Sequence, residues 1–324
     1  MTCNFKFYGV GQGLFYSANL SKNENSIAKF IYDCGSDNTP HLFASIDNYH
    51  KEQSPNMKEF EIEFLAISHL HKDHINGLPR LLKLVKPKKI YLPYFNAKTY
   101  TDAFKAYLIC ANISPQSEEF SLIMNWYINP PENVKFIEEG IQSLGISKWK
   151  FLFFNQRIDN SKFILLQNKI QELISAYGVS SIEEYIENNK DLKDLKNIFL
   201  SVLGKSRQNL TSLLLLHYAD QNPQVQTLLT GDIPFDNNLE MRVLKYLLEE
   251  IKLLLQIPHH GACGEWYKLP ATIKSKASDM VISFGLGNRH KHPSAKCIDD
   301  IVFKYPKSKL NCVFQSNDFC SSIS

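Results

Sequence analysis

The sequence has 324 residues, 44% of them hydrophobic, and a formal net charge of +3. A chain of this length can bury a full core, and so weak a charge argues against a dedicated nucleic-acid-binding surface. No run approaches the roughly 18 consecutive apolar residues of a membrane helix. The seven cysteines are scattered without a Cys-x-x-Cys pair. We therefore expect a soluble, cytoplasmic protein with no membrane partner and no disulfide framework.

Short apolar runs predict strands at about 28–33, 62–68, 88–93, 211–217, 225–230, 251–257 and 279–284. Between the two groups of strands, residues 98–204 predict mostly helices, with apolar positions at three- and four-residue spacing in 162–177 and 191–203. Elements in this order favour a layered α/β sandwich. No linker divides the chain, so we expect a single domain over residues 1–324 with a helical insertion at 98–204.

The strongest candidate site follows the apolar run at 64–68, where the sequence continues His69-Leu70-His71-Lys72-Asp73-His74. In an extended backbone His69 and His71 point to the same side and can bind one metal ion. The following turn carries Asp73 and His74 toward a second ion. The alternative is a polar surface loop, but four potential ligands in six residues favour a metal site.

This His-x-His-x-Asp-His pattern lies between Asp33-Cys34-Gly35 and Leu228-Leu229-Thr230-Gly231-Asp232. In order and strand context the three segments resemble the metallo-β-lactamase superfamily. The resemblance implies a four-layer αββα sandwich, two divalent metal ions (zinc or manganese) and a bridging role for Asp232. Taken alone, the last segment would favour an ordinary Gly-Asp turn at a strand end.

A further ligand is expected in the segment Gln256-Ile257-Pro258-His259-His260-Gly261. The resemblance implies a ligand to the second metal there, with His259 preferred and His260 as the alternative. Asp33 is expected next to the ligands, where its carboxylate would accept a hydrogen bond from the distal N–H of His69 or His71. The alternative is that Asp33 is a simple turn residue at a strand end.

Most dinuclear members of the superfamily supply another histidine between the first cluster and the bridging aspartate. The only histidine in that interval is His217, inside an apolar run, and we interpret it as a core or edge residue. Asn209 stands near the expected ligand position and could bind metal weakly through its amide oxygen or a water, which would favour manganese there.

Three more segments narrow the resemblance to one branch. Val10-Gly11-Gln12-Gly13, the His-His-Gly element, and Ser283-Phe284-Gly285 followed by Asn288-Arg289-His290-Lys291-His292-Pro293 are similar to the nuclease-like domain of the bacterial DNA-uptake protein ComEC. The resemblance implies that His292 faces the substrate phosphate, although it could instead cap a helix. Arg289 and Lys291 would then bind phosphate.

These features predict a metal-dependent hydrolase, and the resemblance implies a phosphodiesterase or nuclease that attacks DNA with a metal-activated water. Asp73, Asp232 and His292 are the expected catalytic residues. One alternative is a hydrolase of a small phosphodiester such as a cyclic nucleotide. Another is a catalytically weakened metal-binding subunit that acts on a protein partner through the helical insertion.

Overall fold

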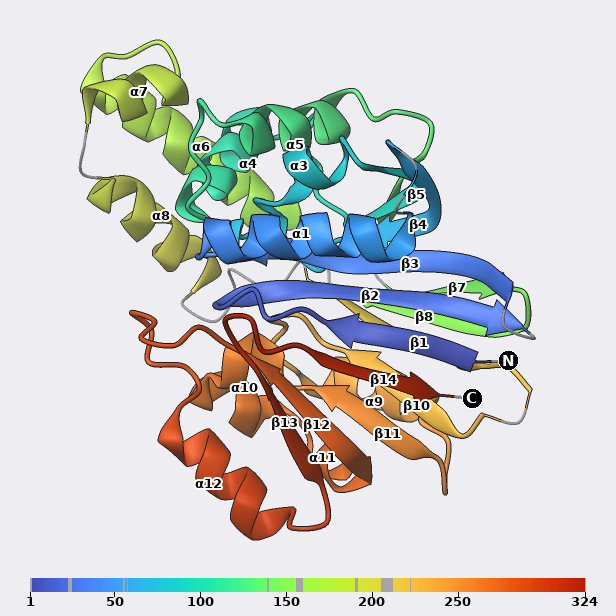
Figure 1. The fold of residues 1–324 in the computed structure, drawn as a ribbon. Helices are drawn as coiled ribbons and strands as arrows, with labels where there is room; N and C mark the ends of the chain where they lie inside the picture. Colours follow the sequence, from blue (N-terminus) through green and yellow to red (C-terminus); the bar gives the residue numbers. More distant parts are fainter. Residues whose placement is uncertain are drawn as a thin grey trace.

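The chain folds into two seven-stranded sheets that face each other, with helices on both outer sides (Figure 1). The computed structural model describes residues 2–22, 25–54, 56, 58–138, 140–155, 160–189, 192–204, 212–221 and 223–323. The first sheet has the order β14 (Phe319–Ile323), β1 (Thr2–Phe7), β2 (Gly13–Lys22), β3 (Asn25–Ser36), β4 (Phe60–Ala66), β5 (Val85–Pro93) and β6 (Val134–Ile137). The second has the order β13 (Lys309–Val313), β12 (Ala277–Ser283), β11 (Lys252–Gln256), β10 (Val225–Leu229), β9 (Leu213–Ala219), β8 (Trp149–Asn155) and β7 (Gly140–Ile146).

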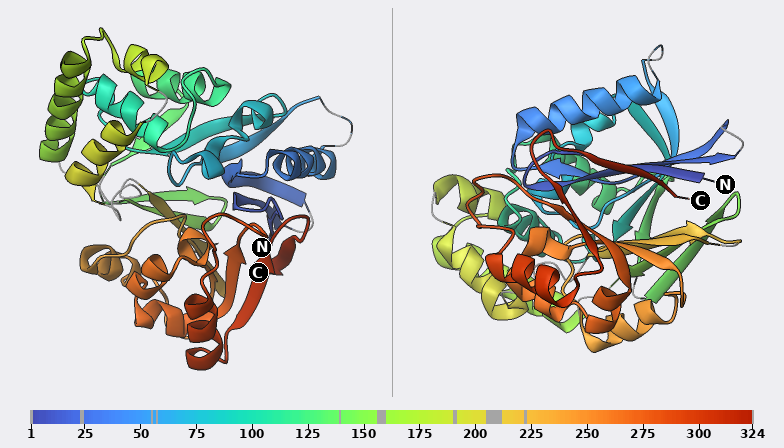
Figure 2. Two further views of the ribbon diagram at one scale, coloured as in Figure 1. Left: turned by 90° about the vertical axis from the view of Figure 1, so that its left-hand side faces the viewer. Right: turned by 60° about the horizontal axis from the view of Figure 1, so that its bottom comes forward.

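Both sheets are mixed. Strands β3 to β6 pair in parallel, as do β10 to β13, and the remaining pairs are antiparallel. The pairing of β1 with β14 brings the two ends of the described chain together, as both views in Figure 2 show.

The strands contribute side chains to three hydrophobic cores, because successive residues of a strand point to opposite faces. In β4, Phe64 packs between the two sheets and Leu65 packs outward against helices. In β9, Leu215 lies between the sheets and Leu216 faces the helices on the other side. A strand buried on both faces reads as a continuous apolar run, which explains why β4 and β9 could be predicted from the sequence.

Two groups of helices complete the layers. The first group contributes to the core outside the first sheet: α1 (Thr39–Gln53), α2 (Lys72–Ile75), α3 (Leu78–Leu81), α4 (Thr101–Cys110), α5 (Glu118–Ile128), α6 (Asn160–Tyr177), α7 (Ile182–Asn188) and α8 (Lys193–Leu203). The second group contributes to the core outside the second sheet: α9 (Asn237–Leu244), α10 (Cys263–Lys268), α11 (Ala271–Lys276) and α12 (Ala295–Lys304). The expected four-layer α/β sandwich is confirmed.

The segment 98–204 is less helical than expected. Helices α6 and α8 match the predicted spacing, but the segment also supplies β6, β7 and β8. The apolar run of β8 pairs with β9 along its whole length, so it extends the second sheet where a helix was expected. The segment thus contains three strands besides its helices, and the division of the chain into one domain with an insertion stays a prediction.

The carboxyl ends of β4, β10, β11 and β12 meet at one edge of the sandwich. The Leu213 N–H at the start of β9 donates to the Ser68 carbonyl just beyond β4, at 2.7 Å, which joins the two sheets there. Loops that follow these strands can therefore bring distant residues together. Within the described ranges, no helix combines the length and the apolar character that crossing a membrane requires.

Candidate metal centre

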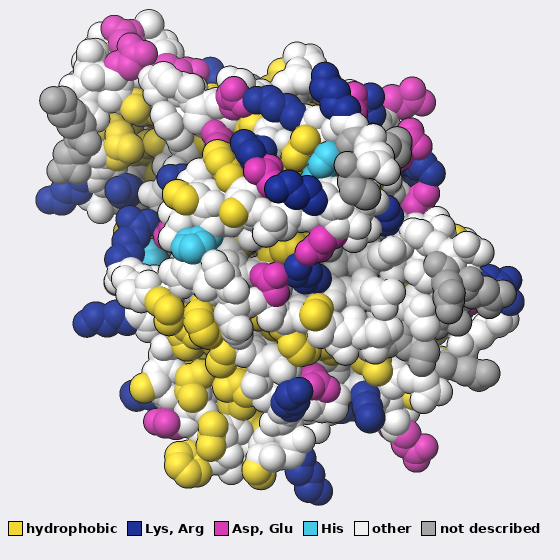
Figure 3. All heavy atoms as spheres, viewed as in Figure 1, with side chains coloured by type: hydrophobic (Ala, Val, Ile, Leu, Met, Phe, Trp, Pro, Cys, Tyr) yellow, Lys and Arg dark blue, Asp and Glu magenta, His cyan; other side chains and the backbone are white. Residues whose placement is uncertain are grey.

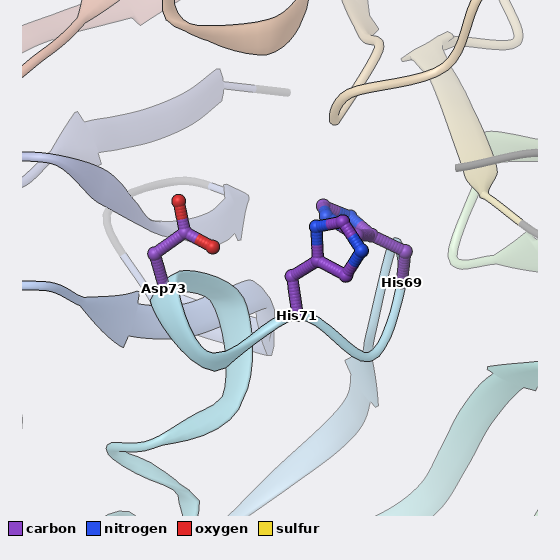
Figure 4. A group of neighbouring side chains, drawn as sticks. All are labelled: His69, His71 and Asp73. Carbon is purple, nitrogen blue, oxygen red and sulfur yellow. The ribbon is translucent and has the colours of Figure 1, made fainter. Parts of the chain in front are cut away.

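The loop between β4 and α2 carries the first group of candidate ligands. His69 and His74 are fully buried, with their ring centroids 4.0 Å apart, and the ring of His71 lies 4.7 Å from that of His69. Figure 4 shows His69 and His71 projecting to the same side of this loop, as their two-residue spacing predicted, with Asp73 of α2 beside them.

Helix α2 is held against the first sheet at Gly35. A Cβ on Gly35 would lie 2.4 Å from the backbone of His74, which leaves no room for any side chain. The Asp33-Cys34-Gly35 element therefore does two things: Gly35 allows α2 to approach, and Asp33 contacts what α2 carries. The His74 Nδ1 lies 2.8 Å from an Asp33 carboxylate oxygen.

The second sheet supplies Asp232, which is 2% exposed and follows β10. Gly231 turns the chain there with a φ of 54°, and a Cβ on it would clash with Ser68 at 2.6 Å. The Gln256 side-chain oxygen accepts hydrogen bonds from the N–H groups of Thr230 and Gly231, at 2.7 and 2.9 Å. This turn fixes the Asp232 carboxylate beside the loop from the first sheet.

The adjacent histidines after β11 adopt an unusual backbone. His259 and His260 both have left-handed dihedrals, with φ of 48° and 51°. Such conformations in side-chain-bearing residues cost on the order of 1 kcal/mol each and concentrate at functional sites. The result here is that both rings face Asp232: the Nε2 of His259 lies 3.6 Å from its Oδ2, and the Nε2 of His260 lies 3.9 Å from its Oδ1.

The Asp232 carboxylate lies close to histidines from both sheets. Its Oδ2 lies 3.7 Å from His69 Nε2, and its Oδ1 lies 3.4 Å from His74 Nε2. Ligand atoms lie within 4.8 Å of one another in three overlapping sets, which are His69 with His71 and Asp73, His69 with His74 and Asp232, and Asp73 with His74 and His260. Ligands around a tetrahedral zinc at 2.0–2.1 Å are roughly 3.3 Å apart, so small side-chain adjustments would suffice for binding.

The hydrogen bonds orient three of the imidazoles for ligation. His260 Nδ1 donates to the Ser283 carbonyl at 2.8 Å, and His74 Nδ1 donates to Asp33. Ser68 Oγ donates to Asp33 at 2.6 Å and can accept from His69 Nδ1 at 2.9 Å. In the neutral form of each ring, the proton on Nδ1 leaves a lone pair on Nε2.

These three Nε2 atoms are buried and have no hydrogen-bond partner among the described residues. They converge with two carboxylates, Asp73 and Asp232, in one cluster. Imidazole nitrogens with anchored Nδ1 atoms, together with carboxylates, are the donor set that zinc or manganese takes in proteins. The residues present therefore fit divalent metal ions.

The electrostatics agree with this donor set. Burial lowers the pKa of His69 well below its usual value and that of His71 to about 4, so both rings are neutral as ligands must be. Burial also lowers the pKa of His74, but the carboxylates of Asp232 and Asp33 outweigh it and raise that pKa well above its usual value. The same negative charges favour a metal cation at His74 Nε2.

The structure changes two details of the expected ligand set. It groups His260, and not the preferred His259, with Asp73 and His74, while His259 instead faces Asp232 and has Glu265 3.5 Å from its Nδ1. Asp33 contacts His74 directly and reaches His69 through Ser68, whereas His71 was an expected partner. The sequence pattern could not resolve either point, because both depend on side-chain direction in loops.

The loop after β12 brings His292 and Arg289 close to the candidate metal centre. Both line a cavity of about 290 Å³ together with His71, Asp73, Asp232 and His259. His292 does not cap α12, because Ser294 occupies that position. Lys291 is exposed and is not among the residues that line this cavity.

Two residues discussed from the sequence lie elsewhere. His217 is fully buried in β9 between the sheets, where Trp149 Nε1 donates to its Nδ1 at 3.2 Å and its Nε2 lies 2.9 Å from the Tyr16 hydroxyl. Its interpretation as a core residue is confirmed. Asn209 falls outside the described residues. Ser68 and Gln256 were not anticipated, because a lone serine or glutamine at a strand end carries no specific signal.

The fold and this cluster define a four-layer αββα protein with a candidate two-metal centre. No family model and no curated protein matches the sequence. Among solved structures, the chain is similar to Igni18, a metallo hydrolase from the archaeon Ignicoccus hospitalis, with 10% identity, 99% of each chain covered and a TM-score of 0.48.

It is also similar to zinc-bound PqqB from Methylobacterium extorquens, with 9% identity, 98% and 99% coverage and a TM-score of 0.42. A third similar structure is the metallo-β-lactamase SMB-1, with 8% identity, 93% and 86% coverage and a TM-score of 0.37. At these identities and TM-scores, the similarity carries no information about activity. The narrower ComEC-like resemblance stays a prediction.

Proposed function

We propose that the chain is a metal-dependent hydrolase that binds two divalent ions, zinc or manganese. The observation that supports it is the convergence of three buried, unpartnered histidine Nε2 atoms with Asp73 and Asp232. His69 and His71 would hold one ion, and Asp73, His74 and His260 the other. Asp232 would lie between them, since its Oδ2 lies near His69 and its Oδ1 near His74 and His260.

Bound ions of this kind supply Lewis acidity and lower the pKa of water toward neutrality. The protein's own groups supply orientation and charge. The Asp232 carboxylate can accept a hydrogen bond from the attacking water and align it. His292 borders the same cavity and can donate a hydrogen bond to a substrate oxygen or leaving group, while Arg289 can neutralise phosphate charge.

The substrate class that fits this cavity best is a phosphodiester, with DNA as the first candidate. Besides the metal ligands, the cavity is lined by Lys72, Arg289, His290 and His292, which can bind anions, and by the carboxylates of Asp37 and Glu265. Figure 3 shows lysine, arginine and histidine side chains together at the left of the molecule, where its upper and lower halves meet. A cyclic nucleotide remains the alternative substrate.

The test is a plasmid-nicking assay with purified protein in manganese or zinc, paired with elemental analysis. We expect nicking by the wild type and by Asp220→Ala, which changes an exposed aspartate after β9, but not by Asp73→Ala. Turnover of cyclic nucleotides without nicking would select the alternative substrate. Bound metal without turnover of either would support a metal-stabilised subunit that acts on a protein partner, and would contradict the proposed hydrolase.

A further inference from the structure

A second cavity adjoins the candidate metal centre. It has a volume of about 480 Å³, which falls within the usual range of ligand sites, about 300–1,000 Å³. The two cavities share a wall, formed by Gln12, Asp37, Lys72, Asn112 and Arg289. A molecule bound at the metals could therefore extend into the outer cavity past these side chains.

Two cationic side chains stand on this shared wall. Lys72 lies between the candidate ligands His71 and Asp73, so its backbone is fixed by the same loop that builds the centre. Arg289 comes from the loop after β12, in the second sheet. Over the described ranges, neither has an ion-pair partner, whereas Lys6, Arg80 and several other exposed cations do, as the short distances to their carboxylate partners show.

The remaining lining suits the neutral parts of a nucleotide. Asn112, with a left-handed φ of 65°, lines both cavities and can offer polar groups to a ligand. The carboxylate of Asp37 can accept hydrogen bonds from sugar hydroxyls or base amino groups. Leu286 is 60% exposed and lines the outer cavity only, where it offers an apolar surface to a base.

We infer that the outer cavity binds the nucleotide next to the scissile phosphodiester, with Lys72 and Arg289 holding that nucleotide's own phosphate. This inference rests on the proposed phosphodiesterase function and specifies its substrate. Cations that face a phosphate from two sides form charge-assisted hydrogen bonds, about twice as strong as neutral ones. A cyclic mononucleotide has one phosphate and would leave this position empty, so the preferred substrate has at least two.

The experiment compares thymidine dinucleotides with and without an additional phosphate at the 5′ or the 3′ end. For the wild type, one of the phosphorylated forms should have a KM lower on the order of tenfold, with kcat little changed, because the contact lies away from the bond that breaks. Lys72→Gln should abolish this preference. Lys296→Gln, an equal loss of charge at an exposed position on α12, should keep it.

Calorimetric binding of the same dinucleotides provides a readout independent of turnover. If no dinucleotide is cleaved, the proposed function fails, while tighter binding of a phosphorylated form that Lys72→Gln abolishes would still support the outer site. Equal binding and equal KM with and without the extra phosphate, or the same loss in both lysine variants, would overturn the inference.

Discussion

Two fully buried histidines of this protein, His217 and His74, differ in the contacts of their second ring nitrogen. His217, in the core between the sheets, has contacts at both nitrogens, with Trp149 and Tyr16. His74, in the candidate centre, has its Nδ1 bonded to Asp33, while its Nε2 lies 3.4 Å from Asp232 Oδ1 and has no hydrogen-bond partner among the described residues. Burial alone thus does not mark a functional histidine. We propose that an anchored Nδ1 together with a Nε2 that lacks a hydrogen-bond partner marks a candidate metal ligand.

This contrast predicts that the hydrogen bonds to the Nδ1 atoms raise the metal affinity of the candidate centre. Asp33→Asn removes the charge that orients His74 and, through Ser68, His69, so metal affinity should fall by about 10–100-fold. Ser68→Ala removes only the link to His69 and should have a smaller effect. Titration of metal-free protein with zinc or manganese measures both. Equal affinity in the wild type and Asp33→Asn would show that the hydrogen bonds are merely structural.

The core histidine should behave in the opposite way. His217→Gln should keep the full metal content but lower the free energy of unfolding by about 1–3 kcal/mol, because the buried polar groups of Trp149 and Tyr16 lose their geometry. Urea denaturation and elemental analysis measure the two quantities. Loss of metal from a folded His217→Gln variant would place His217 in the centre after all.

The pH dependence of stability tests the same contrast. Burial lowers the pKa of His217 from 6.5 to about 3, so the unfolded chain binds a proton in this range that the folded chain does not. This contribution to stability is complete above pH 6.5 and falls by about 1.4 kcal/mol per unit as the pH drops toward 3. His217→Gln lacks this titration, so its stability difference from the wild type should narrow between pH 6.5 and 4. A constant difference would contradict the assignment.

The sequence predicts the first half of the centre better than the second for a physical reason. His69 to His74 are contiguous, and the period of an extended chain places His69 and His71 on one side. The choice between His259 and His260 depends on two left-handed residues, which a pattern does not reveal. Likewise, the strand β8 could not be told from a buried helix, because a short apolar run fits both.

The outer cavity illustrates a further limit of what the sequence can predict. Lys72 stands inside the ligand motif and was visible from the start, but the motif does not indicate the direction of its side chain. Lys291 belongs to the more obvious basic cluster, yet it lines neither cavity, whereas Lys72 lines both. Charge clusters in a sequence therefore identify a region, and the folded loops decide which cation faces the site.

Anomalous diffraction from crystals grown with manganese or zinc tests the central claim most directly. The account predicts two peaks on either side of Asp232, each within about 2.0–2.2 Å of histidine Nε2 atoms from His69, His74 or His260. No peak in this cluster, or metal bound only at other residues, would contradict it.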